Sequence, residues 1–192
     1  MQLQAAFPTR IYLTGFMGCG KSTIGPLLAR RLHYAFLDLD MLVEQQAGRS
    51  IPEIFAAGGE AAFRMLERDA LRRTVAMDAY VIATGGGALA ADDNLAWALR
   101  NGRVVYLQVS VDELVRRLTP EAARRPLLQD RQGRPLKGAA LHRRIATMLA
   151  RRECWYRQAH HVVATDGLSV AETVEAVLHA LRTYRVSRNE RR

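Results

Sequence analysis

The stretch GFMGCGKST, Gly15 to Thr23, constrains the fold more than any other part of the chain. A glycine, four further residues and then Gly-Lys-Ser make a loop whose backbone N–H groups wrap a β-phosphate at a helix N-terminus. In such a loop Lys21 reaches the β- and γ-phosphates, and the Ser22 hydroxyl ligates Mg²⁺. An apolar run precedes the loop and an amphipathic helical pattern follows it, which is the context that the motif requires. The stretch therefore predicts a site for MgATP or MgGTP.

The choice of basic residues supports the same interpretation. The chain has 28 basic residues, of which only Lys21 and Lys137 are lysines and 26 are arginines. A planar guanidinium does not replace a slim ammonium inside a phosphate-binding loop. A lysine at position 21 therefore meets a chemical requirement.

The length and composition predict one α/β domain over residues 1–192. A chain of 192 residues with 49% hydrophobic content can bury a substantial core. No apolar run approaches the roughly 20 residues that cross a bilayer, and the start MQLQAAFPTR lacks the apolar centre of a signal peptide. Cys19 and Cys154 have no partner at a metal-binding or disulfide spacing. We therefore expect no membrane segment and a cytoplasmic protein.

The net charge of +9 is spread along the chain. The local basic cluster is the end RVSRNERR, for which we predict a disordered, solvated tail over residues 186–192. The sequence contains no nucleic-acid-binding motif and no aromatic residues interleaved with the basic ones. We expect no nucleic-acid partner, and a positive field that attracts anionic small molecules.

Apolar runs of strand length alternate with helical patterns, which predicts a doubly wound parallel sheet. The expected architecture is a P-loop NTPase-like three-layer fold, with a central five-stranded parallel sheet flanked by helices. Strands are predicted at Ile11–Thr14, Ala35–Asp38, Tyr80–Ala83, Val104–Val109 and His161–Thr165. Helices are predicted at Lys21–Leu32, Ile51–Phe55, Glu60–Ala76, Asn94–Asn101, Asp112–Leu118, Leu141–Ala159 and Val170–Tyr184.

The segment from Thr119 to Ala140 breaks this alternation. It contains three prolines and two glycines and shows no sustained periodicity. Long irregular segments in compact domains are often lids over an active site. We call residues 119–140 the lid segment and expect it to be mobile.

Ligands of such sheets bind outside the carboxyl ends of the strands. In FLDLD, Asp38 and Asp40 lie two residues apart, so extended geometry would point both side chains to one side. One could orient a Mg²⁺-bound water while the other accepts a hydroxyl proton; alternatively, Asp40 is the N-cap of a helix over MLVEQQAG. The run Gly85–Gly87, here called the glycine strap, ends another strand, and its bare backbone either lets a small ligand approach or forms a plain turn.

Three arginines at separated positions complete the candidate site. They are Arg64, Arg125 and Arg152. Each alone is more typical of a solvated helix residue. Surface ion pairs with helix acids such as Glu60 or Glu153 are the alternative to a role in ligand binding.

Six stretches of the chain, between about Arg10 and Tyr184, together resemble the shikimate kinases. In chain order they are GFMGCGKST, FLDLD, GRSIPEIFAAGGEAAFR, TGGGA, RPLL and RRECWY. The resemblance implies transfer of the ATP γ-phosphoryl group to the 3-hydroxyl of shikimate, with Mg²⁺ as the metal, ATP as co-substrate and a monomeric enzyme. A gluconate kinase would share the phosphate loop but need not combine these stretches. A GTP switch protein is disfavoured because the chain has no Asn-Lys-x-Asp signature.

The resemblance also implies roles for single residues. Asp40 is similar to the aspartate that binds the acceptor hydroxyls, and Asp38 to the one that holds Mg²⁺ through water, beside the direct ligand Ser22. Arg117 is similar to the residue stacked beside adenine. The resemblance assigns catalysis to Lys21, Asp40 and Arg125; ATP binding to Gly18, Cys19, Gly20, Lys21, Ser22, Thr23, Arg117 and Arg125; and shikimate binding to Asp40, Arg64, Gly85, Gly86, Gly87 and Arg152.

The chain departs from the family pattern at two places. Between Arg117 and Arg125 it is one residue longer, and QDRQGRPLKG enlarges the lid segment. Cys154 stands where the family commonly has a proline.

Overall fold

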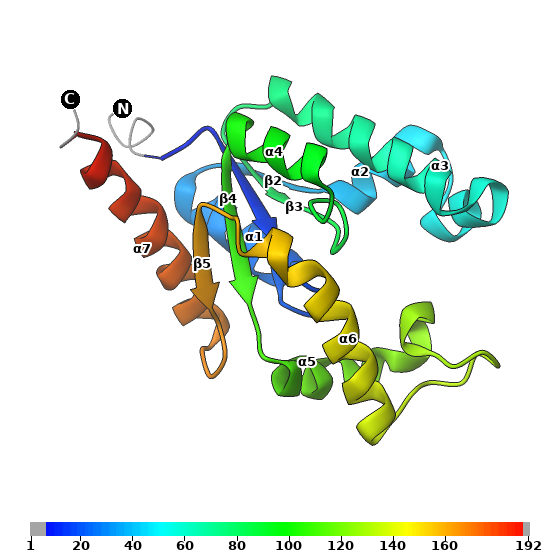
Figure 1. Cartoon of the computed structure of the whole chain (residues 1–192). Coiled ribbons are helices and arrows are strands. Elements are labelled where there is room, and N and C mark those ends of the chain that lie inside the picture. Colours follow the sequence, from blue (N-terminus) through cyan, green and yellow to red (C-terminus); the bar gives the residue numbers. More distant parts are fainter. Residues whose placement is uncertain (1–6, 190–192) are drawn as a thin grey trace.

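A computed structural model describes residues 7–189 (Figure 1). Its centre is a five-stranded sheet in the order β2-β3-β1-β4-β5, and every neighbouring pair is parallel. The predicted fold is confirmed, and each predicted strand end lies within one residue of the observed one. The strands are β1 (Arg10–Thr14), β2 (Ala35–Asp38), β3 (Tyr80–Ala83), β4 (Arg103–Gln108) and β5 (His161–Ala164).

Helices cover both faces of the sheet (Figure 1). The α-helices are α1 (Lys21–Leu32), α2 (Leu39–Ala47), α3 (Ile51–Arg73), α4 (Asp92–Asn101), α5 (Val111–Leu118), α6 (Gly138–Tyr156) and α7 (Val170–Asn189). Short 3-10 turns lie at η2 (Thr74–Ala76), η3 (Thr119–Arg124) and η4 (Pro126–Leu128).

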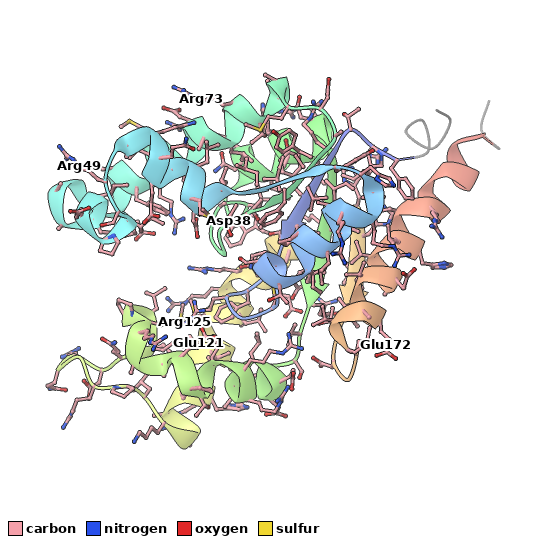
Figure 2. The ribbon with its side chains drawn as sticks, turned by 180° about the vertical axis from the view of Figure 1, so that it is seen from behind. Asp38, Arg49, Arg73, Glu121, Arg125 and Glu172 are labelled. Atoms are coloured by element: carbon pink, nitrogen blue, oxygen red, sulfur yellow. The ribbon has the colours of Figure 1, made fainter. Side chains whose placement is uncertain are left out.

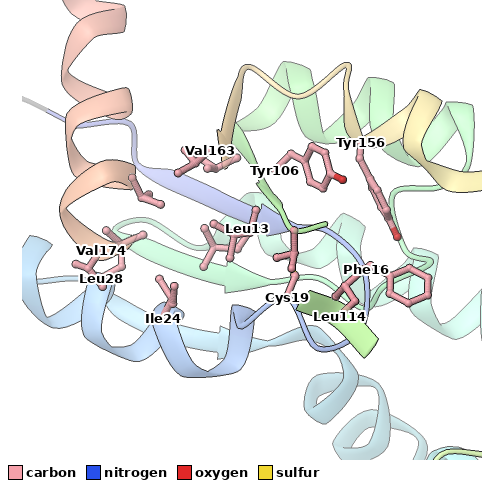
Figure 3. Close-up of a cluster of buried hydrophobic side chains, with 14 of the residues drawn as sticks. Leu13, Phe16, Cys19, Ile24, Leu28, Tyr106, Leu114, Tyr156, Val163 and Val174 are labelled. Atoms are coloured by element: carbon pink, nitrogen blue, oxygen red, sulfur yellow. The ribbon is translucent and has the colours of Figure 1, made fainter. Parts of the chain in front are cut away.

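The central strands are apolar on both faces because each face carries its own core. Alternate residues of a strand point to opposite faces, so Ile11 and Leu13 of β1 pack with α1, α5, α6 and α7 (Figure 3). Tyr12 packs on the other face against α2, α3 and α4. The edge strands β2 and β5 are more exposed. This burial is typical of a parallel sheet between two helix layers.

Two predicted helix ends need correction. Helix α3 (Ile51–Arg73) consists of two helical segments joined at Gly59, whose backbone is not helical (φ 67°), so the predicted break is confirmed; the first segment runs past its predicted end at Phe55. Helix α7 continues to Asn189, so residues 186–189 are helical and the prediction of a disordered tail is wrong there; no proline or glycine stops the helix. Residues 190–192 of that prediction lie outside the described residues.

The lid segment contains more order than its sequence indicates. Two of its own side chains, Ala122 and Leu128, are buried in the hydrophobic core. Beyond them, Gln129 and Pro135 form an isolated antiparallel bridge, and Asp130 accepts hydrogen bonds from two backbone N–H groups of the turn. Helix α6 begins at Gly138, inside the predicted irregular stretch. Within residues 7–189, no helix combines the length and apolarity that crossing a membrane requires.

His160 links β4 to the residues before β5. Its Nδ1 accepts a hydrogen bond from the Val104 N–H at 3.1 Å. Burial lowers the pKa of His160 to about 4, and the positive charges of Arg103 and His161 act in the same direction. The folded protein therefore holds this imidazole neutral at neutral pH.

The free energy of unfolding is expected to fall as the pH drops from about 6.5 to about 4, because the unfolded chain protonates His160 first. At pH 5 the loss should be about 1 kcal/mol, allowing for a half-buried ring. Urea unfolding at pH 7 and pH 5 measures it, with His160→Asn as comparison because its amide oxygen can still accept from Val104. The variant should lose less stability than the parent. An equal loss in both proteins would show that His160 is not the titrating group.

Candidate active site

The carboxyl end of the sheet opens into a cavity of about 1020 Å³. The phosphate loop lines one wall, and the lid segment contributes another. Figure 2 shows Asp38 on the sheet side and, opposite it, Glu121 and Arg125 on the lid segment. The predicted nucleotide residues that line this cavity are Gly18, Cys19, Gly20, Lys21, Ser22, Thr23, Arg117 and Arg125.

The phosphate loop depends on glycine for its shape. Gly15 has a φ of 138°, and a Cβ there would lie 2.8 Å from the Leu107 carbonyl oxygen. Gly20 has a φ of 100° immediately before α1. The loop holds Lys21 buried, with its Nζ donating to the carbonyls of Gly15 at 2.8 Å and Phe16 at 3.1 Å. The ammonium is thereby fixed beside the N-terminus of α1, where a phosphate is favoured.

Asp38, and not Asp40, caps helix α2. Asp38 ends β2, and its Oδ1 accepts from the Asp40 N–H at 3.0 Å. Its Oδ2 accepts from the Ser22 hydroxyl at 3.0 Å. Asp40 is already the second residue of α2, so both the extended geometry predicted for this pair and the alternative of an Asp40 N-cap are wrong. The helix begins at Leu39, two residues earlier than an Asp40 N-cap would place it, yet both carboxylates still line the cavity.

The Asp40 side chain has an unsatisfied oxygen. Its Oδ1 is buried and has no hydrogen-bond partner among residues 7–189. Burial raises the pKa of Asp40, the charge of Asp38 raises it further, and Lys21 offsets part of the increase. A Cβ on Gly85 would lie 2.6 Å from this Oδ1, so only glycine fits beside it. A buried carboxylate with a free oxygen and a raised pKa can accept a proton or a ligand hydroxyl.

Arg64 is held by two glutamates on its own helix. Its Nη1 donates to Glu67 Oε2 at 2.6 Å, and its Nη2 to Glu60 Oε1 at 3.1 Å. Glu67 is only 1% exposed, and burial raises its pKa while Arg64 acts in the opposite direction. Sequence reasoning missed Glu67. The signal was its spacing, because Phe63, Glu67 and Leu71 follow one another every four residues along the buried side of α3.

Arg152 lies against the glycine strap. Its Nη1 donates to the Gly86 carbonyl at 3.2 Å, and the Tyr156 hydroxyl donates to the same oxygen. On the other side, a Cβ on Gly87 would lie 2.8 Å from both Nη atoms of Arg64. Both arginines line a second cavity of about 440 Å³.

The alternative that Arg64 and Arg152 form ion pairs with Glu60 and Glu153 holds only in part. Arg64 does pair with Glu60, at 3.1 Å. Glu153, however, pairs with Arg157 at 2.8 Å and not with Arg152. The fold therefore brings two arginines from α3 and α6 to one strap of bare backbone. Charge-assisted pairs with arginine are the usual means of binding a carboxylate.

On the lid side, two arginines are paired with glutamates of the same cavity. Arg117 donates through Nε to Glu113 at 2.7 Å and through Nη1 to the Gly18 carbonyl at 3.4 Å. Arg125 donates through Nε to Glu121 at 2.8 Å. Both glutamates line the larger cavity, and sequence reasoning did not single them out. Each glutamate stands four residues before its arginine, and this helical spacing is the sequence signal that could have identified the pair.

Comparisons with known proteins show which family the chain resembles. The shikimate kinase family model matches residues 17–182. The shikimate kinase of Salinibacter ruber is 52% identical over 160 residues, which cover 83% of this chain and 78% of that protein. The shikimate kinase of Chlorobium chlorochromatii is 44% identical over 177 residues, which cover 92% of this chain and 93% of that protein.

Solved structures give the same result. The shikimate kinase of Acinetobacter baumannii in complex with shikimate superposes with a TM-score of 0.80 at 33% identity, covering 92% of this chain and 94% of that one. A gluconokinase from Sinorhizobium meliloti reaches a TM-score of 0.62 at 18% identity, with 95% of each chain covered, and shares the fold alone.

Proposed function

The chain belongs to the shikimate kinase family and phosphorylates a hydroxyl group of shikimate, and from this premise we propose how its residues divide the work. The reaction transfers the γ-phosphoryl group of ATP to the 3-hydroxyl of shikimate and gives shikimate 3-phosphate and ADP. The observation that carries the assignment is the position of Asp40. Its free, buried oxygen lies beside the glycine strap and in the same cavity as the phosphate loop.

The nucleotide half of the proposed site consists of the phosphate loop, Arg117 of α5 and Arg125 of the lid segment. Lys21 stabilises the β- and γ-phosphate oxygens, and Arg125 adds positive charge at the transferring group. Arg125 must first leave Glu121, an exchange that costs little because exposed ion pairs contribute at most about 1 kcal/mol. Arg117 lies beside the Gly18 carbonyl and covers the adenine.

Mg²⁺ fits the oxygen groups beside the phosphate loop. The Ser22 hydroxyl and an Asp38 carboxylate oxygen lie 3.0 Å apart, and hard oxygen ligands of this kind suit Mg²⁺. We propose that Ser22 holds the ion directly and Asp38 through a water molecule. When bound, the ion neutralises charge on the β- and γ-phosphate oxygens.

The acceptor half of the proposed site orients shikimate between Asp40 and the two arginines of the strap. Arg64 and Arg152 bind its carboxylate, while Asp40 accepts the hydrogen bond of the 3-hydroxyl and then its proton. Gly85, Gly86 and Gly87 line the acceptor site, and the missing side chains of Gly85 and Gly87 leave room for the Asp40 carboxylate and the Arg64 guanidinium beside the ligand. Glu67 fixes the guanidinium of Arg64, so Arg64 meets the ligand already oriented.

A panel of small hydroxy acids tests this function. We expect ATP-dependent phosphorylation of shikimate, with gluconate and other hydroxy acids turned over at least about 100-fold less efficiently, because they do not fill both halves of the site. A coupled ADP assay measures the rates, and product analysis identifies the phosphorylated hydroxyl. Preferred turnover of another acid, or of GTP over ATP, would contradict the proposal.

The lid segment is expected to gain protection from hydrogen exchange when both substrates bind. Closing it over the phosphates removes water and orders residues 119–137. Exchange measured by mass spectrometry, with a non-hydrolysable ATP analogue and shikimate, should show slower uptake there. The buried strand β4 serves as control and should not change. Equal uptake in the lid segment with and without ligands would mean that it does not gate the site.

We also propose that the enzyme acts as a monomer in the cytoplasm. The residues proposed for both halves of the site line two cavities of a single copy. Light scattering of the purified protein tests the monomer, and a dimer at working concentration would overturn it.

A further inference from the structure

Tyr156 ends α6 with its hydroxyl inside the protein. The residue is 1% exposed, and its hydroxyl donates a hydrogen bond to the Gly86 carbonyl, 70 residues away in the chain. Its ring packs on Tyr106, with ring centroids 5.1 Å apart (Figure 3). Packing of the ring does not require a hydroxyl, so the hydrogen bond to the central glycine of the strap calls for a separate explanation.

The Gly86 carbonyl is where α6 meets the strap. It accepts from the Tyr156 hydroxyl and from Arg152 Nη1, so two side chains one helical turn apart hold the same oxygen. A carbonyl oxygen has two lone pairs, and these two donors satisfy both. Gly86 also adjoins the phosphate loop, because a Cβ there would lie 3.4 Å from the Met17 backbone nitrogen and 3.7 Å from both Arg152 Nη1 and the Gly15 carbonyl oxygen.

A small shift of the strap would displace both parts of the acceptor site, the carboxylate of Asp40 and the guanidinium of Arg64. Gly85 lies against the carboxylate of Asp40, and Gly87 against the guanidinium of Arg64. The strap has no side chains of its own to lock it in place, so its position depends on what holds its backbone. Of the two donors to Gly86, Arg152 is only half-buried and is itself proposed to bind the ligand, whereas Tyr156 is buried.

We propose that Tyr156 is a positioning residue for the acceptor, whose hydroxyl holds the Gly86 carbonyl and thereby sets the strap and the aim of Arg152. The inference rests on the proposed function of the strap and of Arg152. It assigns to Tyr156 a contribution to shikimate binding, without contact to the phosphates or to the reacting hydroxyl.

The hydroxyl is suited to this role at every working pH. Burial raises the pKa of Tyr156 to about 12, and Arg152 acts in the opposite direction. The phenol therefore stays protonated and donates to the carbonyl, leaving the remaining N–H groups of Arg152 for a carboxylate. Removing only the hydroxyl keeps the packed ring and leaves Gly86 with Arg152 as its single donor.

The neighbouring tyrosine provides a matched control. Tyr106 is equally buried and packs on the same ring, but its hydroxyl has no hydrogen-bond partner among the described residues. Tyr106→Phe and Tyr156→Phe therefore remove the same atom from the same cluster. Only the second removes a bond to the strap.

Steady-state kinetics of the full-length enzyme test the inference. In Tyr156→Phe we expect the KM for shikimate to rise 5- to 20-fold, with kcat within threefold of the parent and the KM for ATP unchanged. Tyr106→Phe should have the same kcat, the same KM for shikimate and the same KM for ATP as the parent. Replacing Tyr156 by 4-aminophenylalanine, which restores a donor at the ring, should recover most of the affinity and also serves if the Phe variant proves unstable. Thermal unfolding verifies that each variant is folded.

A double-substitution cycle shows whether Tyr156 acts through Arg152. If it does, adding Tyr156→Phe to Arg152→Ala lowers kcat/KM for shikimate by a smaller factor than Tyr156→Phe does in the parent enzyme, because contributions that share a partner are not additive. Independent losses, an unchanged shikimate KM in Tyr156→Phe, or equal rises in both KM values would overturn the inference. An Arg152→Ala enzyme with parental shikimate KM would instead overturn the proposed acceptor site, so the two failures are distinguishable.

Discussion

Asp40→Asn is expected to lower kcat for shikimate by a factor on the order of 10² or more while the protein stays folded. Asparagine keeps the volume of the side chain but cannot take the proton of the acceptor hydroxyl. Among the residues that the structure describes, the buried Oδ1 of Asp40 has no hydrogen-bond partner to lose, so stability should change little. Circular dichroism and thermal unfolding monitor the fold beside the kinetic assay.

The pH profile gives this prediction a second measurement. The pKa of Asp40 is raised by burial and by Asp38, and only the ionised form can accept a proton. Activity should therefore be present above that pKa and fall as the pH drops through it, at a pH above the range of an ordinary aspartate. In Asp40→Asn this limb should disappear. Near-parental kcat in the variant would leave Asp40 with a structural role in α2 only.

Lys21→Ala should show a loss of similar size for a different reason. The ammonium is buried and fixed by the carbonyls of its own loop, and its charge acts on the transferring phosphate. The KM for ATP should rise together with the fall in kcat, whereas Asp40→Asn should leave the KM for ATP unchanged. This contrast separates the nucleotide half of the proposed site from the acceptor half.

The second large effect concerns the carboxylate of the substrate. Charge-assisted hydrogen bonds from Arg64 and Arg152 contribute about 1.5 to 3 kcal/mol each, less what solvent screens. The parent enzyme should therefore prefer shikimate over its uncharged carboxamide by about 10² to 10⁴ in kcat/KM. In Arg64→Ala and in Arg152→Ala this preference should collapse, with little change in the KM for ATP.

Arg157→Ala is the matched control for this measurement. Arg157 follows α6 directly and pairs with Glu153 at 2.8 Å, but it lines neither cavity described above. Its removal changes the net charge as much as Arg152→Ala does and should leave the acid preference intact. An acid preference that survives both active-site substitutions would place the carboxylate elsewhere and reopen the identity of the acceptor.

The parts of the protein that depend on neighbours in the chain could be predicted from the sequence. The glycine and lysine spacing of the phosphate loop encodes its own backbone dihedrals, and strand and helix periodicity placed every strand to within one residue. The order of the motifs sufficed to place Asp38, Asp40 and the glycine strap at the open end of the sheet, because parallel strands share one carboxyl end.

Only the tertiary structure decided what joins residues far apart in the chain. The hydrogen bonds of Arg152 and Tyr156 to Gly86 span 66 and 70 residues, and no local pattern encodes them. Burial of Glu67 beneath Arg64, and the start of α2 that made Asp38 the cap, depend on how helices pack on the sheet. The sequence by itself determined the chemical groups and the edge where they gather. Packing determined which oxygen each donor meets, because that depends on distances set by the whole fold.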